Sequence, residues 1–259
     1  MKLILDEGNS RYVKEGNIDK GYIIDENGDC NGFTCPVCTV YKDDVRIDSL
    51  EHKDLIKSVI FNVNVTSVGD CAFEGCGKII KVNMRNVTSV GNDAFSYCTN
   101  LANIRLLKVI SIGNGAFNCC SHLRKMDLPN VTSIGEWAFA GCHDLIDVNM
   151  PKVTSVGEGV FSGCWRLKII NSPNVTSIGE WAFHECHNLI DVNMPNVTSV
   201  GDEAFRYCRG LVSVNLPNLT SIGDSAFKHC EKLKRIIVGN EEIAKQLRRE
   251  YFNIEVIVK

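Results

Sequence analysis

Apolar and polar residues follow one another along most of this chain in a pattern that repeats every 22 residues. The stretch from Asn130 to Pro151, NVTSIGEWAFAGCHDLIDVNMP, has eight versions that succeed one another without insertions. One invariant glycine marks the period: Gly69, Gly91, Gly113, Gly135, Gly157, Gly179, Gly201 and Gly223. A short fixed period of this kind predicts one supersecondary unit stacked on itself, which is a solenoid.

Two further columns of the repeat are apolar and constant. Four residues after each glycine comes phenylalanine, at Phe73, Phe95, Phe117, Phe139, Phe161, Phe183, Phe205 and Phe227. Three residues later comes cysteine, at Cys76, Cys98, Cys120, Cys142, Cys164, Cys186, Cys208 and Cys230. Their spacing in GxxAFxxCxxL predicts a short helical turn that presents both columns to the core.

After the cysteine the apolar period changes to two. In residues 145–150, LIDVNM, Val148 and Met150 alternate with polar residues, which predicts a short strand. Strands one repeat apart would pair in parallel at about 4.8 Å, in a sheet roughly 35 to 40 Å long. The expected fold is therefore an α/β solenoid of eight 22-residue repeats, with a parallel sheet on one face and short helical turns on the other.

The pattern LxxLxLPxxLTSIGxxAFxxCxx, over about residues 55–238, resembles the BspA-like (Treponema-type) class of leucine-rich repeat. The resemblance implies a leucine-rich repeat solenoid whose role is binding, and related surface proteins attach cells to host proteins or to other microbes. We therefore expect three parts: an N-terminal cap at 1–54, the solenoid at 55–238 and a C-terminal cap of one helix and one strand at 239–259.

The two flanks lack the repeat and are expected to cover the ends of the solenoid. In the N-terminal flank, strands are predicted at Lys2 to Leu5, Arg11 to Lys14 and Gly21 to Asp25. In the C-terminal flank, residues 241–252 have apolar side chains at helical spacing, acids first and bases last, and predict a helix. A closing strand is predicted from Ile254 to Val258.

Charge and composition narrow the function classes. With 28 basic and 31 acidic residues the formal net charge is −3, which does not favour nucleic-acid binding. No apolar stretch approaches the roughly 20 residues of a membrane-spanning helix, and the first residues do not read as a signal peptide. Eight of the 13 cysteines recur with the repeat, so we expect reduced, buried thiols and a reducing, intracellular compartment. The family resemblance leaves the cell surface as the alternative.

One cysteine cluster lies outside the repeat, at Cys30, Cys35 and Cys38 in CNGFTCPVC. It could form part of a zinc site, with Cys71 or His52 as the fourth ligand. The alternative is a turn with partly buried thiols or a local redox pair. No cofactor is expected, and no catalytic activity, because every nucleophile or acid that could be nominated has copies in the other repeats.

Recognition is expected in the columns that vary. On the strands, two columns point away from the core and define a polar surface of mixed charge. We expect a macromolecular partner to bind there, through Lys81, Asn83, Asn103, Arg105, Lys125, Asp127, Asp147, Asn149, Asn171, Asp191, Asn193 and Asn215. The run of asparagines can instead satisfy itself along a parallel sheet.

A second contact patch is expected at Trp137, Trp165 and Trp181, if these side chains are clustered and exposed. The alternative is that they fill the space beside glycines in neighbouring repeats. The sequence thus predicts a non-enzymatic protein-binding module, with a cell-surface adhesin or a structural subunit of a larger assembly as alternatives. It does not identify the partner or the oligomeric state.

Overall fold

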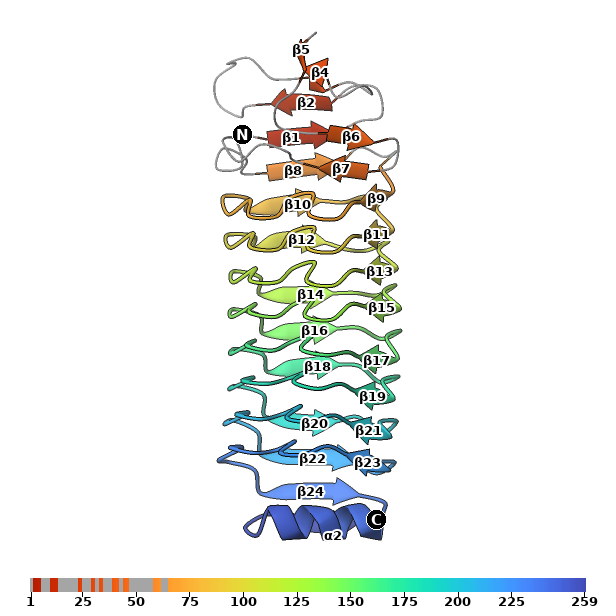
Figure 1. Cartoon of the computed structure of the whole chain (residues 1–259), viewed down its shortest axis with the longest axis vertical. Helices are drawn as coiled ribbons and strands as arrows, with labels where there is room; N and C mark the ends of the chain where they lie inside the picture. Colours follow the sequence, from red (N-terminus) through yellow and green to blue (C-terminus); the bar gives the residue numbers. More distant parts are fainter. Residues whose placement is uncertain are drawn as a thin grey trace.

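The structure is a computed structural model that describes residues 65–259 throughout. Before residue 65 it describes the backbone of β1 to β8 and, of the side chains, Val59 and Phe61. The described repeats wind into a parallel solenoid, with each coil stacked directly on the next (Figure 1).

One face of the solenoid, which we call the strand face, carries one short strand per coil. These strands are β10 (Lys81–Asn83), β12 (Asn103–Arg105), β14 (Lys125–Asp127), β16 (Asp147–Asn149), β18 (Ile169–Asn171), β20 (Asp191–Asn193), β22 (Ser213–Leu216) and β24 (Arg235–Val238). Where they pair, they do so in parallel with partners 22 residues apart, such as Val148 with Ile170. The predicted strand and its register are therefore confirmed.

A second ladder of two-residue strands runs along an adjacent side of the solenoid, and the sequence analysis did not predict it. Its members are β9 (Ser67–Val68), β11 (Ser89–Val90), β13 (Ser111–Ile112), β15 (Ser133–Ile134), β17 (Ser155–Val156), β19 (Ser177–Ile178), β21 (Ser199–Val200) and β23 (Ser221–Ile222). The threonine just before these strands reaches from coil to coil, as when Thr198 Oγ1 donates to the Thr176 carbonyl at 3.1 Å. Side chain and backbone thus both tie neighbouring coils together.

The side opposite the strand face is built of successive turns, and none of the described repeats contains a helix there. Backbone amides in each turn donate to the next coil, for example Phe95 N to the Ala116 carbonyl at 2.8 Å, while others close the turn locally, for example Cys98 N to the Phe95 carbonyl at 3.1 Å. Because part of the backbone pairs between coils, the apolar spacing of the phenylalanine and cysteine columns produces turns where short helical turns were expected.

The phenylalanine column forms the centre of the core. All eight rings are buried, and successive rings stack nearly parallel, with centroids 5.1 to 5.7 Å apart. Such stacked rings contribute beyond the apolar area they bury. The inward direction predicted for this column is confirmed.

The cysteine column is also buried, as predicted, and from Cys120 to Cys230 its thiols form no disulfide. Each thiol from Cys98 to Cys230 donates to the carbonyl of the phenylalanine 25 residues earlier, as Cys142 Sγ does to the Phe117 oxygen at 3.3 Å. Burial raises the pKa of the thiols from Cys120 to Cys230, to about 12 for Cys230. The column is thus a ladder of neutral thiols that caps backbone carbonyls inside the solenoid.

The N-terminal flank contains eight described strands, and all of them except β6 and β7, which form a separate two-stranded sheet, extend the sheet of the strand face. They are β1 (Lys2–Leu5), β2 (Ser10–Val13), β3 (Ile23–Ile24), β4 (Asp29–Cys30), β5 (Phe33–Thr34), β6 (Thr39–Tyr41), β7 (Asp44–Arg46) and β8 (Ser58–Phe61). Strand β8 pairs in parallel with both β10 and β1, and β2 pairs with β1 in antiparallel fashion. The three strands predicted in this flank are confirmed within about two residues.

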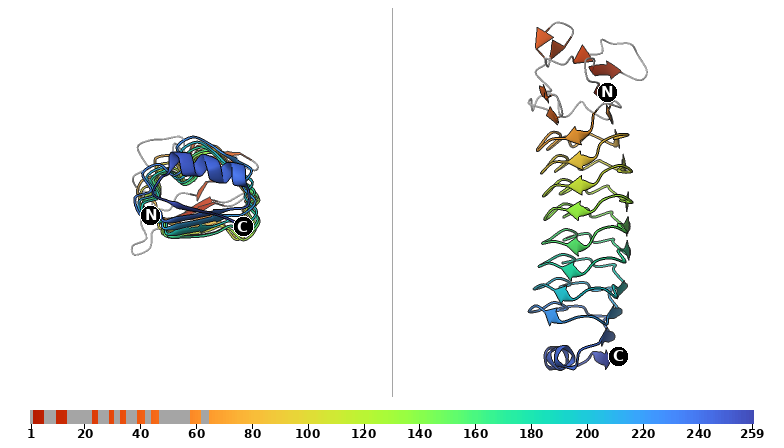
Figure 2. Two further views of the ribbon diagram at one scale, coloured as in Figure 1. Left: turned by 90° about the horizontal axis from the view of Figure 1, so that it is seen from below. Right: turned by 90° about the vertical axis from the view of Figure 1, so that its right-hand side faces the viewer.

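The C-terminal end is closed by α2 (Glu241–Glu250) and β25 (Glu255–Val258), as predicted. Asn240 caps the helix by accepting from the Glu242 amide at 2.8 Å. Figure 2 shows α2 lying across the end of the stack, where Ile243, Ala244 and Leu247 are buried. In the described part of the chain, no helix combines the length and apolarity that crossing a membrane requires.

The glycine column gives a test of how closely the coils approach. A Cβ atom at Gly135 would lie 2.4 Å from the Asn114 nitrogen, whereas one at Gly157 would meet nothing nearer than 3.9 Å. We therefore expect Gly135→Ala to lower the unfolding free energy by about 1 to 3 kcal/mol, and Gly157→Ala to change it by less than about 1 kcal/mol. Equal losses in urea unfolding of the two variants would contradict close coil contact as the reason for the column.

The thiol ladder predicts steep destabilisation at alkaline pH. Because their pKa is raised by burial, Cys120, Cys142, Cys164, Cys186, Cys208 and Cys230 stay protonated in the folded state. In the unfolded state they ionise above the ordinary thiol pKa, so the stabilisation is complete below that value and is lost as pH rises through it. Each thiol then contributes about 1.4 kcal/mol per pH unit. The unfolding free energy, measured in urea from pH 8 to 10, should fall with this slope. In Cys164→Ala the slope should be smaller by the contribution of one thiol. An unchanged slope in that variant would contradict the argument.

Candidate functional site

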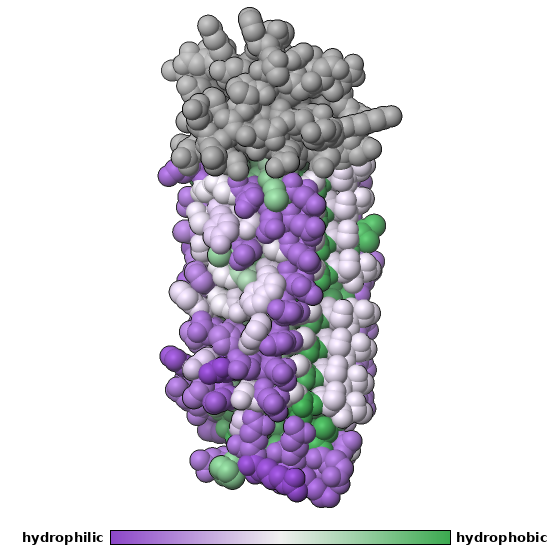
Figure 3. All heavy atoms as spheres, viewed as in Figure 1, coloured by the Kyte–Doolittle hydropathy of each residue, from purple (hydrophilic) through white to green (hydrophobic). Residues whose placement is uncertain are grey.

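The twelve residues expected to bind a partner all lie in strands of the strand face, from β10 to β22. Within each strand the middle residue is turned to the core, as Val148 and Val192 are, while the residues on either side are exposed or half-buried. The structure therefore brings these polar side chains into two adjacent rows on one surface. Figure 3 shows hydrophilic residues over much of this face. That a partner binds them stays a prediction.

The asparagine row is largely engaged with itself. Asn149 Nδ2 donates to Asp127 Oδ1 at 2.7 Å, Asn171 Nδ2 donates to Asn149 Oδ1 at 2.7 Å, and Asn215 Nδ2 donates to Asn193 Oδ1 at 2.8 Å. The alternative of self-satisfied amides is thus what the structure shows. These bonds hold the side chains in fixed orientations, so the surface they present is preorganised.

The neighbouring row is paired by charge and hydroxyl contacts. Lys125 Nζ lies 3.0 Å from Asp147 Oδ2, and Ser213 Oγ donates to Asp191 Oδ1 at 2.5 Å. An exposed pair such as Lys125 with Asp147 adds little stability because water screens it. Its effect is to neutralise charge in the middle coils of the strand face.

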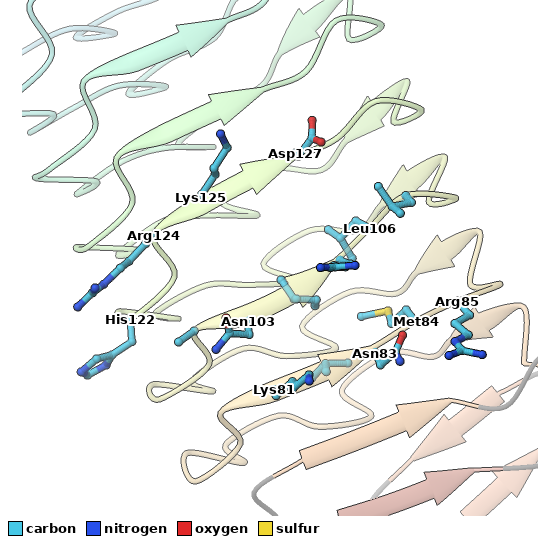
Figure 4. Close-up of a pocket in the computed structure, with 15 residues that line it drawn as sticks. Lys81, Asn83, Met84, Arg85, Asn103, Leu106, His122, Arg124, Lys125 and Asp127 are labelled. Atoms are coloured by element: carbon cyan, nitrogen blue, oxygen red, sulfur yellow. The ribbon is translucent and has the colours of Figure 1, made fainter.

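The first described coils differ from the middle ones, because a groove of about 1180 Å³ lies over β10, β12 and β14. Its lining includes Lys81, Arg85, Arg105, Arg124 and Lys125, with Asp127 as the one acidic lining residue. Figure 4 shows His122 and Arg124 where the strands begin and Arg85 just past the end of β10. The expectation of mixed charge is therefore wrong for this section of the strand face, which is basic.

Sequence reasoning missed Arg85, His122, Arg124 and Leu107 because it considered only the two columns within the strands. Arg85 and Leu107 occupy the column that holds proline in the next five repeats, and Arg124 immediately precedes β14. Comparing every outward column, including those that flank the strands, would have found them. The groove also lies where the eight-stranded sheet ends, at β12, and the next sheet begins, at β14.

Two of the tryptophans pack on the turn side. Trp137 and Trp181 lie two coils apart with ring centroids 5.9 Å from one another, and both are half-buried. A Cβ atom at the intervening Gly159 would lie 2.3 Å from the Trp137 ring. The rings therefore occupy the space that this glycine leaves, as in the alternative that the tryptophans fill space beside glycines. Both tryptophans have a positive φ, 57° for Trp137 and 52° for Trp181.

Trp165 belongs to a different column and to a different stack. Its ring lies between His143, at 3.8 Å between centroids, and His187, at 6.3 Å. It is 43% exposed, but a histidine lies against each face of the ring, which leaves its edge exposed. The three tryptophans thus split into a pair and a separate stack, and their role as a contact patch stays a prediction.

Within the described residues, no group of three or more histidine, cysteine, aspartate or glutamate side chains is arranged to hold a metal ion. The side chains of Cys30, Cys35 and Cys38 lie outside the described residues, so the zinc interpretation stays a prediction. On the turn side, burial lowers the pKa of His184, and the Arg206 guanidinium lowers the pKa of Glu203, which it contacts at 2.7 Å.

These features define the chain as a parallel solenoid with one polar strand face, the class to which leucine-rich repeat proteins belong. It belongs to the family of BspA-type leucine-rich repeat regions, whose sequence profile matches residues 47–146 and 132–254. The family resemblance read from the repeat is thus confirmed. Repeat regions of this family and fold are typically scaffolds without catalytic function. Comparison with curated protein sequences gives no match.

Solved structures of bacterial leucine-rich repeat proteins share the fold. A leucine-rich cell surface protein from Faecalibacterium prausnitzii is 22% identical with a TM-score of 0.54, over 90% of this chain and 76% of that one. A leucine-rich repeat protein from T. pallidum is 24% identical with a TM-score of 0.50, over 84% of this chain and 92% of that one. At this level of identity the likeness supports the fold.

The asparagine row yields a paired mutational test. Asn149→Asp places a second carboxylate 2.7 Å from Asp127, whereas Asn193→Asp keeps an acceptor for the Asn215 amide. We expect Asn149→Asp to lower the unfolding free energy at pH 7 by about 1 to 2 kcal/mol, and Asn193→Asp to have a smaller effect.

The pH dependence of this pair separates charge repulsion from a lost hydrogen bond. Repulsion between the carboxylates raises their folded-state pKa, so the penalty is present above that pKa and disappears as pH falls below about 4. Urea unfolding of both variants at pH 7 and pH 3.5 measures it. A penalty in Asn149→Asp that persists unchanged at pH 3.5 would contradict the charge argument.

Proposed function

We propose that this chain is a non-enzymatic protein-binding module that recognises a macromolecular partner through the strand face. The single observation that supports this most is that constant and variable positions of the repeat differ in where their side chains lie. The constant phenylalanine and cysteine residues are buried, while the strand face carries polar side chains that differ between coils. A repeat scaffold of this kind offers an extended surface for binding.

Preorganisation strengthens the proposal. The asparagine side chains are already ordered by bonds such as that between Asn171 and Asn149, so little rotamer freedom remains to be lost on binding. These side chains are exposed or half-buried, so their remaining donors and acceptors can pair with polar groups of a partner. The absence of a unique acid, base or nucleophile among the outward columns is consistent with a binding role.

Attachment at a cell surface is a second candidate function. It is favoured by the fold shared with a protein described as a leucine-rich cell surface protein. In that role the strand face would contact a protein of another cell. A structural role within a larger assembly would instead use the ends or the turn side, including the tryptophans.

The proposal is tested with partners captured from the source organism by the immobilised chain, then purified and titrated. Replacing Asn149, Asp191 and Asn193 together with alanine should weaken binding at least tenfold, because these side chains lie centrally on the strand face. Cooperative urea unfolding should persist, since the lost bonds are exposed.

A matched variant with Glu136, Glu158 and Glu180 replaced by alanine changes three side chains on the turn side. It should bind with unchanged affinity. Loss of binding in this control, with retention in the strand-face variant, would reject the strand face as the site.

A further inference from the structure

The groove over β10, β12 and β14 holds cations that have no acidic partner in the described part of the chain. Lys81, Arg85, Arg105 and Arg124 all have exposed side chains, and none forms an ion pair with a described residue. Lys125 differs, because Asp147 compensates its charge at 3.0 Å. We call the surface formed by Lys81, Arg85, Arg105 and Arg124 the basic groove.

The same coils depart from the repeat in their outward positions only. In the coil of residues 101–110, Leu106 and Val109 keep the buried positions, at 1% and 0% exposure. In the outward positions Arg105, Leu107 and Ile110 replace residues that are mostly asparagine, proline and threonine in the other repeats. Since packing does not require these substitutions, they change what the surface presents while leaving the core as it is.

Exposed apolar side chains occur in the same coils, and one of them, Leu107, lines the groove with the cations. Ile80, Leu107 and Ile110 are 48%, 52% and 49% exposed. A surface that combines free guanidinium groups with aliphatic side chains complements a peptide segment that carries carboxylates and apolar residues. Sugar-phosphate backbones lack such aliphatic groups, and the chain's net charge of −3 opposes a long polyanion.

We propose that the basic groove binds an acidic, extended segment of the partner protein, with Arg85, Arg105 and Arg124 pairing with its carboxylates. This inference rests on the proposed function, and it adds that the part of the partner bound by the first described coils is acidic. The groove crosses three strands, about 10 Å of stack at the spacing of paired strands. An extended segment rises about 3.3 Å per residue, so about three residues cross this distance.

The test uses the full chain and a fluorescently labelled deca-glutamate peptide, with binding followed by anisotropy at low salt. Replacing Arg85, Arg105 and Arg124 together with glutamine should weaken binding at least tenfold. Raising the ionic strength should weaken binding to the unaltered chain, because exposed charges are screened.

The chain offers a control matched in charge. Replacing Lys168, Lys234 and Arg235 with glutamine removes three exposed cations from later coils of the same surface, and Lys168 and Lys234 occupy the column of Arg124. This variant should bind the peptide within about twofold of the unaltered chain, because local pairing and not net charge determines affinity.

Three results would overturn the proposal: no binding of deca-glutamate by the unaltered chain, equal losses in the two triple variants, or tighter groove-dependent binding of a sulfated heparin octasaccharide. The last would assign the groove to an anionic glycan. The strand-face residues Asn149, Asp191 and Asn193 do not line the groove. A partner lost on their replacement but retained on replacement of the three arginines would leave the proposed function standing and reject this inference alone.

Discussion

The structure depends on one constraint: the backbone of each coil must hydrogen-bond to the coil before it and the coil after it. Three separate ladders satisfy this constraint, along the strand face, along the short serine-containing strands and along the turns. Because all three ladders repeat every 22 residues, every insertion or deletion would misalign the other columns. The constant glycine column follows from the same requirement, because at most of its described positions, such as Gly135, a Cβ atom would collide with the backbone of the preceding coil.

The stacking constraint also decides which positions are free to vary. Rings such as Phe117 and Phe139 stack, and thiols such as Cys142 donate to a carbonyl of the preceding coil. The phenylalanine and cysteine positions therefore hold the same residue in every coil. Outward positions are bound only by contacts along their own column. In the middle coils those contacts are asparagine bonds and an ion pair. In the first coils they are absent between the cations, so charge there is available for an external partner.

Much of the fold was predictable from the sequence because stacking requires the same residue types at the same positions of every repeat. The inward phenylalanine and cysteine columns, the strand and the closing helix are examples. The turns were mistaken for helical turns because apolar spacing reports which side chains face inward and not where the amides donate. The basic groove was missed because its charges come from several columns. Arg124 precedes a strand, Arg85 follows one, and only the folded coil brings them to one surface.

The solenoid is not a uniform array, and its discontinuities divide the strand face into sections. The sheet is interrupted between β12 and β14 and again between β18 and β20. At the second interruption the core position that is Met150 and Met194 in the flanking coils is Ser172, whose buried hydroxyl has no hydrogen-bond partner. An unsatisfied buried hydroxyl lowers stability, so we expect this coil to be less stable than its neighbours.

The first interruption coincides with the basic groove. Where a ladder of backbone bonds is broken, side chains on either side are no longer held at the spacing of paired strands, and the surface between them can hollow. The sections of the strand face therefore differ in chemistry as well as in pairing: unpaired cations surround the groove at the first interruption, and bonds between asparagine side chains order the later coils. Recognition by this chain is best understood section by section, with the breaks in the sheet as their boundaries.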